Sequence, residues 1–254
     1  MWCGRLGAAP AYARAPDATH YAASTMKAAV LAAVHRSGRS LDEPIPVIND
    51  FPSAAGGRFG CTQRYDNDDA VWDRLGSTAS LGWLTTRMIV RSSNLATNLV
   101  LETVGRDAVA SVWADAGARH SVVARGIEDS AAAAAGVTNL VTAADLARLL
   151  SAIALAAPTL APGPACEAML ATLLAQEIND DLAAGLPAGT RIAHKNGWVD
   201  GVRHGAGVIF PDDAPPFVLA VCLTTPLAVN DTDDDACRLL SNIASAAWAA
   251  RHAL

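Results

Sequence analysis

The chain has 254 residues and a formal net charge of −6, and alanine supplies much of its 52% hydrophobic content. This length can bury one large core, or one core divided between two lobes. Nothing resembles a basic stripe, which argues against a nucleic-acid partner. No apolar stretch approaches the roughly 18 residues that a membrane-spanning helix needs.

The first third of the chain combines a strand, a helix and a long irregular stretch. Residues 2–13 fit little more than one strand. Apolar side chains at positions 26, 30, 31 and 34 recur at steps of three and four, which predicts a helix that ends at Gly38. Residues 41–76 are rich in Pro, Gly, Asp and Asn, which is typical of loops and short segments.

The middle of the chain has the three- to four-residue period of helices, with one interruption. Gly105 and Gly117 each end a helical pattern. Small residues with weak periodicity predict a loop over residues 125–139. The predicted helices cover residues 81–90, 94–104, 107–116, 143–156 and 166–177.

Near the C-terminus the pattern changes to short strands. Three strand-like runs, over residues 190–195, 206–210 and 217–223, are separated by turns. Acidic residues within 231–235 then open a final helix that runs to His252. Because acidic groups suit the positive end of a helix dipole, we interpret this run as a helix start and not as a metal site.

This order of elements predicts an α+β fold, in which an antiparallel sheet is flanked by helices and an all-helical lobe is inserted. We assign residues 1–20 and 187–254 to a discontinuous sheet lobe. Residues 21–186 form the predicted helical lobe, which carries the first chemical motif described below.

Neither the cysteines nor the histidines form a ligand pattern. The cysteines are odd in number and lack C-x-x-C spacing, so we interpret them as mostly small buried apolar residues. The histidines show no metal-ligand spacing and are interpreted as structural. We therefore expect no metal and no cofactor. The residues concerned are Cys3, Cys61, Cys166, Cys222 and Cys237, and His20, His35, His120, His194, His204 and His252.

A serine and a lysine one helical turn apart form the first chemical motif. In Ser24-Thr25-Met26-Lys27 both side chains leave the same helix face, and the ammonium nitrogen can reach the hydroxyl. Serine needs a neighbour that takes its proton, and lysine can do so only if its pKa is lowered. The pattern alone also occurs on ordinary helix surfaces. It gains weight because Lys27 and Lys195 are the only lysines among 19 Lys and Arg residues.

Two further motifs follow in the chain, Ser92-Ser93-Asn94 and Lys195-Asn196-Gly197. In the order STMK, SSN and KNG, the three motifs resemble the signature of class A β-lactamases and penicillin-binding proteins. The resemblance runs from about residue 22 to the C-terminal helix. It implies a β-lactamase/transpeptidase-like fold with its site at the junction of the two lobes.

The resemblance also implies a role for each matching residue. Ser24 would be the nucleophile, and Lys27 would help to take its proton. Ser92 would relay a proton to the leaving nitrogen, bridging toward Lys195. Lys195 would draw the substrate carboxylate and help to keep Lys27 neutral. The backbone N–H groups of Ser24 and Trp198 would form the oxyanion hole. The other substrate-binding residues implied are Asn94, Asn196, Gly197 and Arg203, although Arg203 has the alternative of a surface position on its strand.

Three positions depart from the family pattern. Ser93 replaces the usual Asp of the second motif, and Asn196 replaces the Thr or Ser of the third. The loop over residues 125–139 lacks the Glu-x-x-Leu-Asn segment, whose Glu activates the water that releases the acyl group in class A enzymes. Glu128 or Asp129 can supply a carboxylate, and we take Glu128 as the candidate, with an ordinary polar loop residue as the alternative.

The start of the chain leaves the compartment open. It has no basic leader followed by an apolar run, so no signal peptide is visible. We expect a cytoplasmic protein if this start is correct and an exported one if a leader lies upstream. The segment before Ser24 is also shorter than is usual in the family, so an incomplete sheet is an alternative.

We expect this protein to hydrolyse a β-lactam amide through an acyl-enzyme on Ser24. One alternative is a penicillin-binding-like D-Ala peptidase or esterase that deacylates slowly. Another is a non-catalytic binding protein on the same fold. The expected partner is a small-molecule β-lactam or acyl-peptide substrate, and the expected oligomeric state is a monomer.

Overall fold

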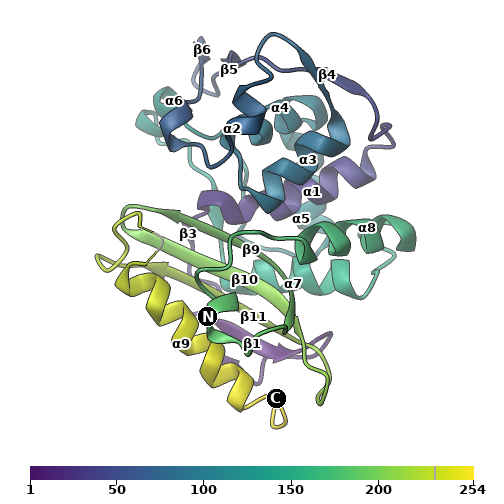
Figure 1. Cartoon of the computed structure of the whole chain (residues 1–254), viewed down its shortest axis with the longest axis vertical. Helices are drawn as coiled ribbons and strands as arrows, with labels where there is room; N and C mark the ends of the chain where they lie inside the picture. The colour runs from purple at the N-terminus through teal and green to yellow at the C-terminus, as the bar shows by residue number, and fades with distance from the viewer. Residues whose placement is uncertain (232) are drawn as a thin grey trace.

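A five-stranded antiparallel sheet forms one layer of the molecule (Figure 1). The computed structural model describes residues 1–231 and 233–254. The strand order β2-β1-β11-β10-β9 brings the first and last parts of the chain into one sheet. The strands are β1 (Trp2–Arg5), β2 (Tyr12–Ala13), β9 (Arg191–Val199), β10 (Val202–Phe210) and β11 (Phe217–Thr224).

Helices cover both faces of this sheet, which is why its central strands are buried almost throughout. Alternate residues of β11 enter two different cores. Phe217 and Leu219 pack with Leu240 of α9 (Asp235–Ala249) on one face. Val218 belongs to the core on the other face, where α7 (Ala143–Ala154) lies against β10 and β11. The predicted α+β fold is confirmed.

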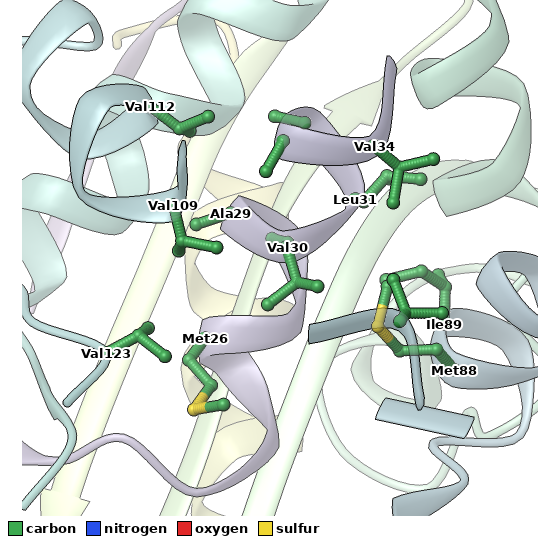
Figure 2. Close-up of a cluster of buried hydrophobic side chains, with 14 of the residues drawn as sticks. Met26, Ala29, Val30, Leu31, Val34, Met88, Ile89, Val109, Val112 and Val123 are labelled. Carbon is green, nitrogen blue, oxygen red and sulfur yellow. The ribbon is translucent and has the colours of Figure 1, made fainter. Parts of the chain in front are cut away.

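A bundle of helices forms the second layer, built around α1 (Lys27–Arg36). The first eight residues of α1 are all buried, because helices pack around it on several sides. Its alanines let the neighbours approach closely, while larger side chains such as Val30 and Leu31 fill the space between them (Figure 2). The neighbours are α3 (Leu81–Val90), α4 (Asn94–Val104), α5 (Arg106–Asp115) and α8 (Gly163–Leu174).

Most of the long elements lie where the sequence predicts them. Gly105, at a φ of 80°, is left-handed between α4 and α5, a conformation in which glycine avoids the strain of a side chain. Helix α8 lies three residues earlier than predicted because Gly163 and a proline at its N-terminus start it. Strands β9 and β10 both extend beyond the predicted runs.

The short elements were missed more often. Residues 125–139 were predicted as a loop, but they contain α6 (Ser130–Ala134), whose first turn is capped by Asp129. Residues 2–13 form two paired strands, where one was predicted. The remaining short elements are β3 (His20–Tyr21), β4 (Pro44–Pro46), β5 (Phe51–Pro52), β6 (Arg58–Phe59), β7 (Thr78–Ser80), β8 (Leu140–Val141), α2 (Asp69–Trp72), η1 (Ala23–Met26), η2 (Gln63–Tyr65) and η3 (Ala183–Gly185).

The five cysteines are all buried and free, as their interpretation as small apolar residues requires. No helix in residues 1–231 and 233–254 combines the length and the apolar character needed to cross a membrane. The division into lobes at residues 20 and 187 stays a prediction.

Candidate active site

Ser24 lies in η1, between the short strand β3 and the central helix α1. The chain turns sharply before it, since Ala23 has a φ of 44° in the left-handed region. Ser24 is half-buried and lines a cavity of about 730 Å³. The turn therefore presents a serine hydroxyl at the junction between the sheet and the helices.

Lys27 begins α1 and is completely buried. Its Nζ donates to the Ser92 carbonyl oxygen at 2.7 Å, to Asn94 Oδ1 at 3.0 Å and to Ser92 Oγ at 3.2 Å. Burial lowers the pKa of Lys27 to about 8, although the negative charges of Asp66 and Glu128 oppose this shift. Burial therefore brings the neutral form of the amine closer to physiological pH, although the ammonium form still predominates there.

The second motif forms a tight turn between α3 and α4. Ser92 is fully buried with a φ of 58°, and Ser93 caps α4 by accepting from the backbone N–H of Ala96 at 3.1 Å. This turn points Ser92 Oγ and Asn94 Oδ1 at the same ammonium group. The sequence motif thus becomes a binding site for the Lys27 side chain.

Asp66 is a site residue that the sequence analysis missed. Its Oδ2 accepts from Ser93 Oγ at 3.1 Å and from the backbone N–H of Leu95 at 2.8 Å. The carboxylate absent from the middle of the SSN motif is therefore supplied from another part of the chain. The only local signal was the run of acidic and amide residues from Asp66 to Asp69.

The third motif lies on β9, with its lysine buried behind the pocket. Lys195 is 1% exposed, and its Nζ donates to Asn196 Oδ1 at 2.9 Å and to the Asn196 carbonyl at 3.0 Å. Burial lowers the pKa of Lys195 well below its usual value, and the nearby charge of Lys27 lowers it further. Among the described residues no hydrogen bond joins Lys195 to Ser92, so the expected bridge between them is not made here.

Gly197 brings β9 directly against the nucleophile. A Cβ at this position would lie 2.7 Å from the backbone nitrogen of Ser24 and 2.9 Å from that of Thr25. Only glycine allows this approach without a shift of the backbone. Trp198, the next residue, lines the cavity together with Ser24, so the two residues expected to form the oxyanion hole border the same space.

Arg203 lies behind Trp198, with its guanidinium carbon 5.2 Å from the centre of the Trp198 ring. Its side chain is fully buried, and it donates to the Asp231 carbonyl at 2.8 Å and to Cys237 Sγ at 3.1 Å, toward α9. Arg203 is not among the residues that line the cavity. This placement gives no support to a role in binding the substrate carboxylate, nor does it fit the alternative of a surface arginine.

The two candidate carboxylates of the loop have different surroundings. Glu128 lines the cavity, where its Oε2 accepts from the backbone N–H of Thr62 at 2.8 Å and its Oε1 from Asn94 Nδ2 at 3.3 Å. Asp129 is fully buried and accepts from Ser53 Oγ and from the backbone N–H of Ala54. Burial opposes the ionisation of Asp129, but these hydrogen bonds outweigh it and lower its pKa. Glu128 therefore faces the cavity, whereas Asp129 holds the loop in place.

Comparison with known families identifies the chain. Residues 4–250 match the model of the β-lactamase enzyme family, which is nearly the whole chain. The protein belongs to the β-lactamase family. No curated protein gives a significant match in sequence.

Solved structures of the family share the fold of this β-lactamase-family chain at low identity. A β-lactamase from Sphaerobacter thermophilus is 24% identical with a TM-score of 0.79. The match covers 99% of this chain and 90% of the Sphaerobacter chain. A β-lactamase from Xanthomonas campestris is 19% identical with a TM-score of 0.77, and the match covers 98% of this chain and 89% of the Xanthomonas chain. PBP-A is 23% identical with a TM-score of 0.72, and the match covers 92% of this chain and 83% of the PBP-A chain. At these identities the likeness establishes the fold.

The structure of this family member brings most of the predicted site together. Ser24, Asn94, Glu128 and Trp198 line one cavity. Lys27, Ser92, Lys195 and Asn196 are buried. Within residues 1–231 and 233–254, no group of three His, Cys, Asp or Glu side chains is arranged to hold a metal ion. The arrangement places a half-buried serine hydroxyl one helical turn before a buried amine, with no hydrogen bond between them among the described residues. These are two groups that nucleophilic acyl transfer can use.

Proposed function

We propose that this member of the β-lactamase family hydrolyses the amide bond of a β-lactam through an acyl-enzyme on Ser24. The observation that carries the proposal is the environment of Lys27. A lysine buried one turn after a cavity-lining serine, with a pKa of about 8, is suited to accept the serine proton near neutral pH. One neighbouring structure of a PBP-A mutant is an acyl-enzyme complex with penicillin G, which makes the same chemistry a reasonable expectation on this fold.

In the acylation step, Ser24 Oγ attacks the lactam carbonyl carbon as neutral Lys27 accepts the hydroxyl proton. The backbone N–H groups of Ser24 and Trp198 hold the negative charge that develops on the carbonyl oxygen. When the C–N bond breaks, Ser92 donates a proton to the leaving nitrogen and is reprotonated from Lys27, whose ammonium already donates to it. The products are the Ser24 ester and the opened ring.

In the deacylation step, we assign Glu128 as the base that activates water. Its carboxylate lines the cavity with Ser24, and Asn94 holds it by one hydrogen bond while accepting another from Lys27. The water transfers a proton to Glu128 and attacks the ester carbonyl carbon. As the bond from that carbon to Ser24 Oγ breaks, Glu128 returns the proton to Ser24 Oγ. The acid product is released and the free enzyme is restored.

A chromogenic cephalosporin and a fluorescent penicillin test both steps. Continuous colour is expected from the unmodified protein, and Ser24→Ala should abolish both colour and labelling. Glu128→Gln should keep the acylation step and trap the adduct, which intact-mass spectrometry detects as a long-lived increase in mass. The matched control is Glu167→Gln, since Glu167 lies on α8 and outside the cavity.

Each alternative predicts a different result in the same experiment. A lasting label on Ser24 without turnover of the unmodified protein would indicate a slowly deacylating peptidase or esterase. Absence of both label and turnover would refute the proposal and favour a binding protein. Normal turnover by Glu128→Gln would refute the role of Glu128 alone.

A further inference from the structure

The two cations expected to bind the substrate carboxylate do not reach the cavity. Lys195 is 1% exposed, and Asn196 occupies its ammonium group with two hydrogen bonds. Arg203 is fully buried and directed toward α9. Two other arginines line the cavity, the exposed Arg64 and the buried Arg125. A buried guanidinium is the stronger anion site of the two, because water screens it less.

Arg125 supplies a buried guanidinium on the cavity wall. It lines the same cavity as Ser24 although its side chain is only 7% exposed. Its Nη2 donates to the Tyr21 hydroxyl and its Nη1 to the Gly126 carbonyl, both at 3.2 Å. Tyr21 lines the cavity too, and the guanidinium carbon lies 5.4 Å from the centre of its ring.

The protein does not provide hydrogen-bond acceptors for every N–H group of this guanidinium. Its Nε is buried without a hydrogen-bond partner. No carboxylate of the described residues lies within 4.0 Å of Arg125, and the neighbouring Asp129 is bonded to Ser53 and Ala54 instead. The charge of Arg125 helps to lower the pKa of Asp129, but no ion pair joins the two side chains among the described residues. A buried N–H without an acceptor is costly, so the cavity favours a ligand that brings an anionic acceptor to this point.

The position of Arg125 indicates which part of the substrate it meets. Arg125 comes from the same loop as Glu128, which we assign to the step that acts on the ester left on Ser24. Ser92, which we assign to the leaving nitrogen, comes from another element and is buried. With Glu128 assigned to that step, we infer that the loop wall faces the acyl part that stays attached to the serine.

We propose that Arg125, supported by Tyr21, binds a carboxylate on the acyl side chain of the substrate. This inference rests on the proposed acylation of Ser24. It identifies the preferred substrate class as acyl donors with an acidic acyl side chain. The planar fork of arginine suits a carboxylate because two parallel N–H groups can meet its two oxygens.

Two penicillins that differ by one carboxylate test the inference. Carbenicillin is benzylpenicillin with a carboxylate added to the acyl side chain, so the ring and the leaving group are the same in both. The measured quantity is the ratio of the acylation kcat/KM for carbenicillin to that for benzylpenicillin. In Arg125→Gln this ratio should fall by about tenfold, the effect expected for one charge-assisted contact. Acylation by benzylpenicillin should change much less.

The matched control is Arg119→Gln, which removes an exposed arginine outside the cavity and should leave the ratio unchanged. Thermal unfolding of each variant checks that it is folded. If Arg125→Gln is not recovered in folded form, Arg125→Lys replaces it. Lysine keeps the charge but lacks the two parallel N–H groups of arginine, so the ratio of the two kcat/KM values should fall several-fold in this variant.

The outcomes separate this inference from the proposed function. If neither penicillin labels Ser24 in the unmodified protein, the proposed function fails and the inference fails with it. If both penicillins acylate Ser24 and the ratio is the same in the Arg125 variants, only the inference is overturned. Arg125 would then serve to hold the loop through its contact with Tyr21.

Discussion

Replacing Lys27 by methionine separates the cost of burying this amine from its use in catalysis. Methionine has a similar length and no charge, so Lys27→Met should abolish acylation of Ser24. It also removes a group whose charged form the fold disfavours, since burial lowers the pKa of Lys27 from 10.5 to about 8. At about 1.36 kcal/mol per pKa unit, a shift of this size destabilises the folded protein by roughly 3 kcal/mol near neutral pH.

The sign of the pH dependence follows from this shift. Between about pH 8 and pH 10.5 the unfolded chain keeps a proton on Lys27 that the folded protein has released. The unmodified protein therefore becomes more stable relative to Lys27→Met as the pH rises through this range. From pH 6.5 to pH 9.5 the difference in unfolding free energy between the two should change by about 2 kcal/mol in favour of the unmodified protein.

Urea unfolding of both proteins at several pH values measures this difference. The absolute difference at one pH also contains the hydrogen bonds that methionine cannot make to Ser92 and Asn94, so the change of the difference with pH, and not its absolute value, reports the pKa. The control is Arg39→Met, because arginine stays charged throughout and that residue is exposed. A difference between Lys27→Met and the unmodified protein that stays constant with pH would refute the lowered pKa and, with it, the assignment of Lys27 as the base.

Three further predictions concern the same site. Gly197→Ala should reduce acylation by at least about 100-fold, because the new Cβ would lie 2.7 Å from the backbone nitrogen of Ser24 and must displace β9 or η1. Gly163→Ala, where nothing lies within 4 Å, is the control, and equal labelling of the two variants would contradict the argument. The rate of acylation should rise with pH and level off above about pH 8 as Lys27 becomes neutral, and a rate that is flat from pH 6 to pH 9 would exclude this base. Asp66→Asn should move that midpoint to lower pH, since the Asp66 charge raises the pKa of Lys27; an unchanged midpoint would mean that Asp66 acts only as a helix cap.

The carboxylates show why part of the site could not be predicted from the sequence. The loop around Glu128 and Asp129 offered two adjacent acidic residues, and nothing in their order distinguished them. Their roles separate only because Ser53 and Ala54, some 75 residues away, bind Asp129 and leave Glu128 to face the cavity. Asp66 was missed for the same reason, since its partner Ser93 is 27 residues distant.

A second reason why the site could not be predicted is that neighbouring residues of a strand point to opposite faces of the sheet. Arg203 and His204 are neighbours on β10, but they lie on opposite faces of the sheet. His204 approaches the backbone of Tyr21, while Arg203 approaches α9. A shift of one residue in register would exchange them, and the register is set by pairing with β9 and β11.

The sequence by itself determined the motif order, the spacing of Ser24 and Lys27, the long helices and the family, because these depend on residues near one another or on a recognisable pattern. Tertiary structure alone decided which charges are buried, which face the cavity and which find partners. Arg203 and Arg125 carry the same side chain, and they differ only in what the folded chain places around them. Burial and long-range hydrogen bonds are properties of the packed molecule, so no local pattern encodes them.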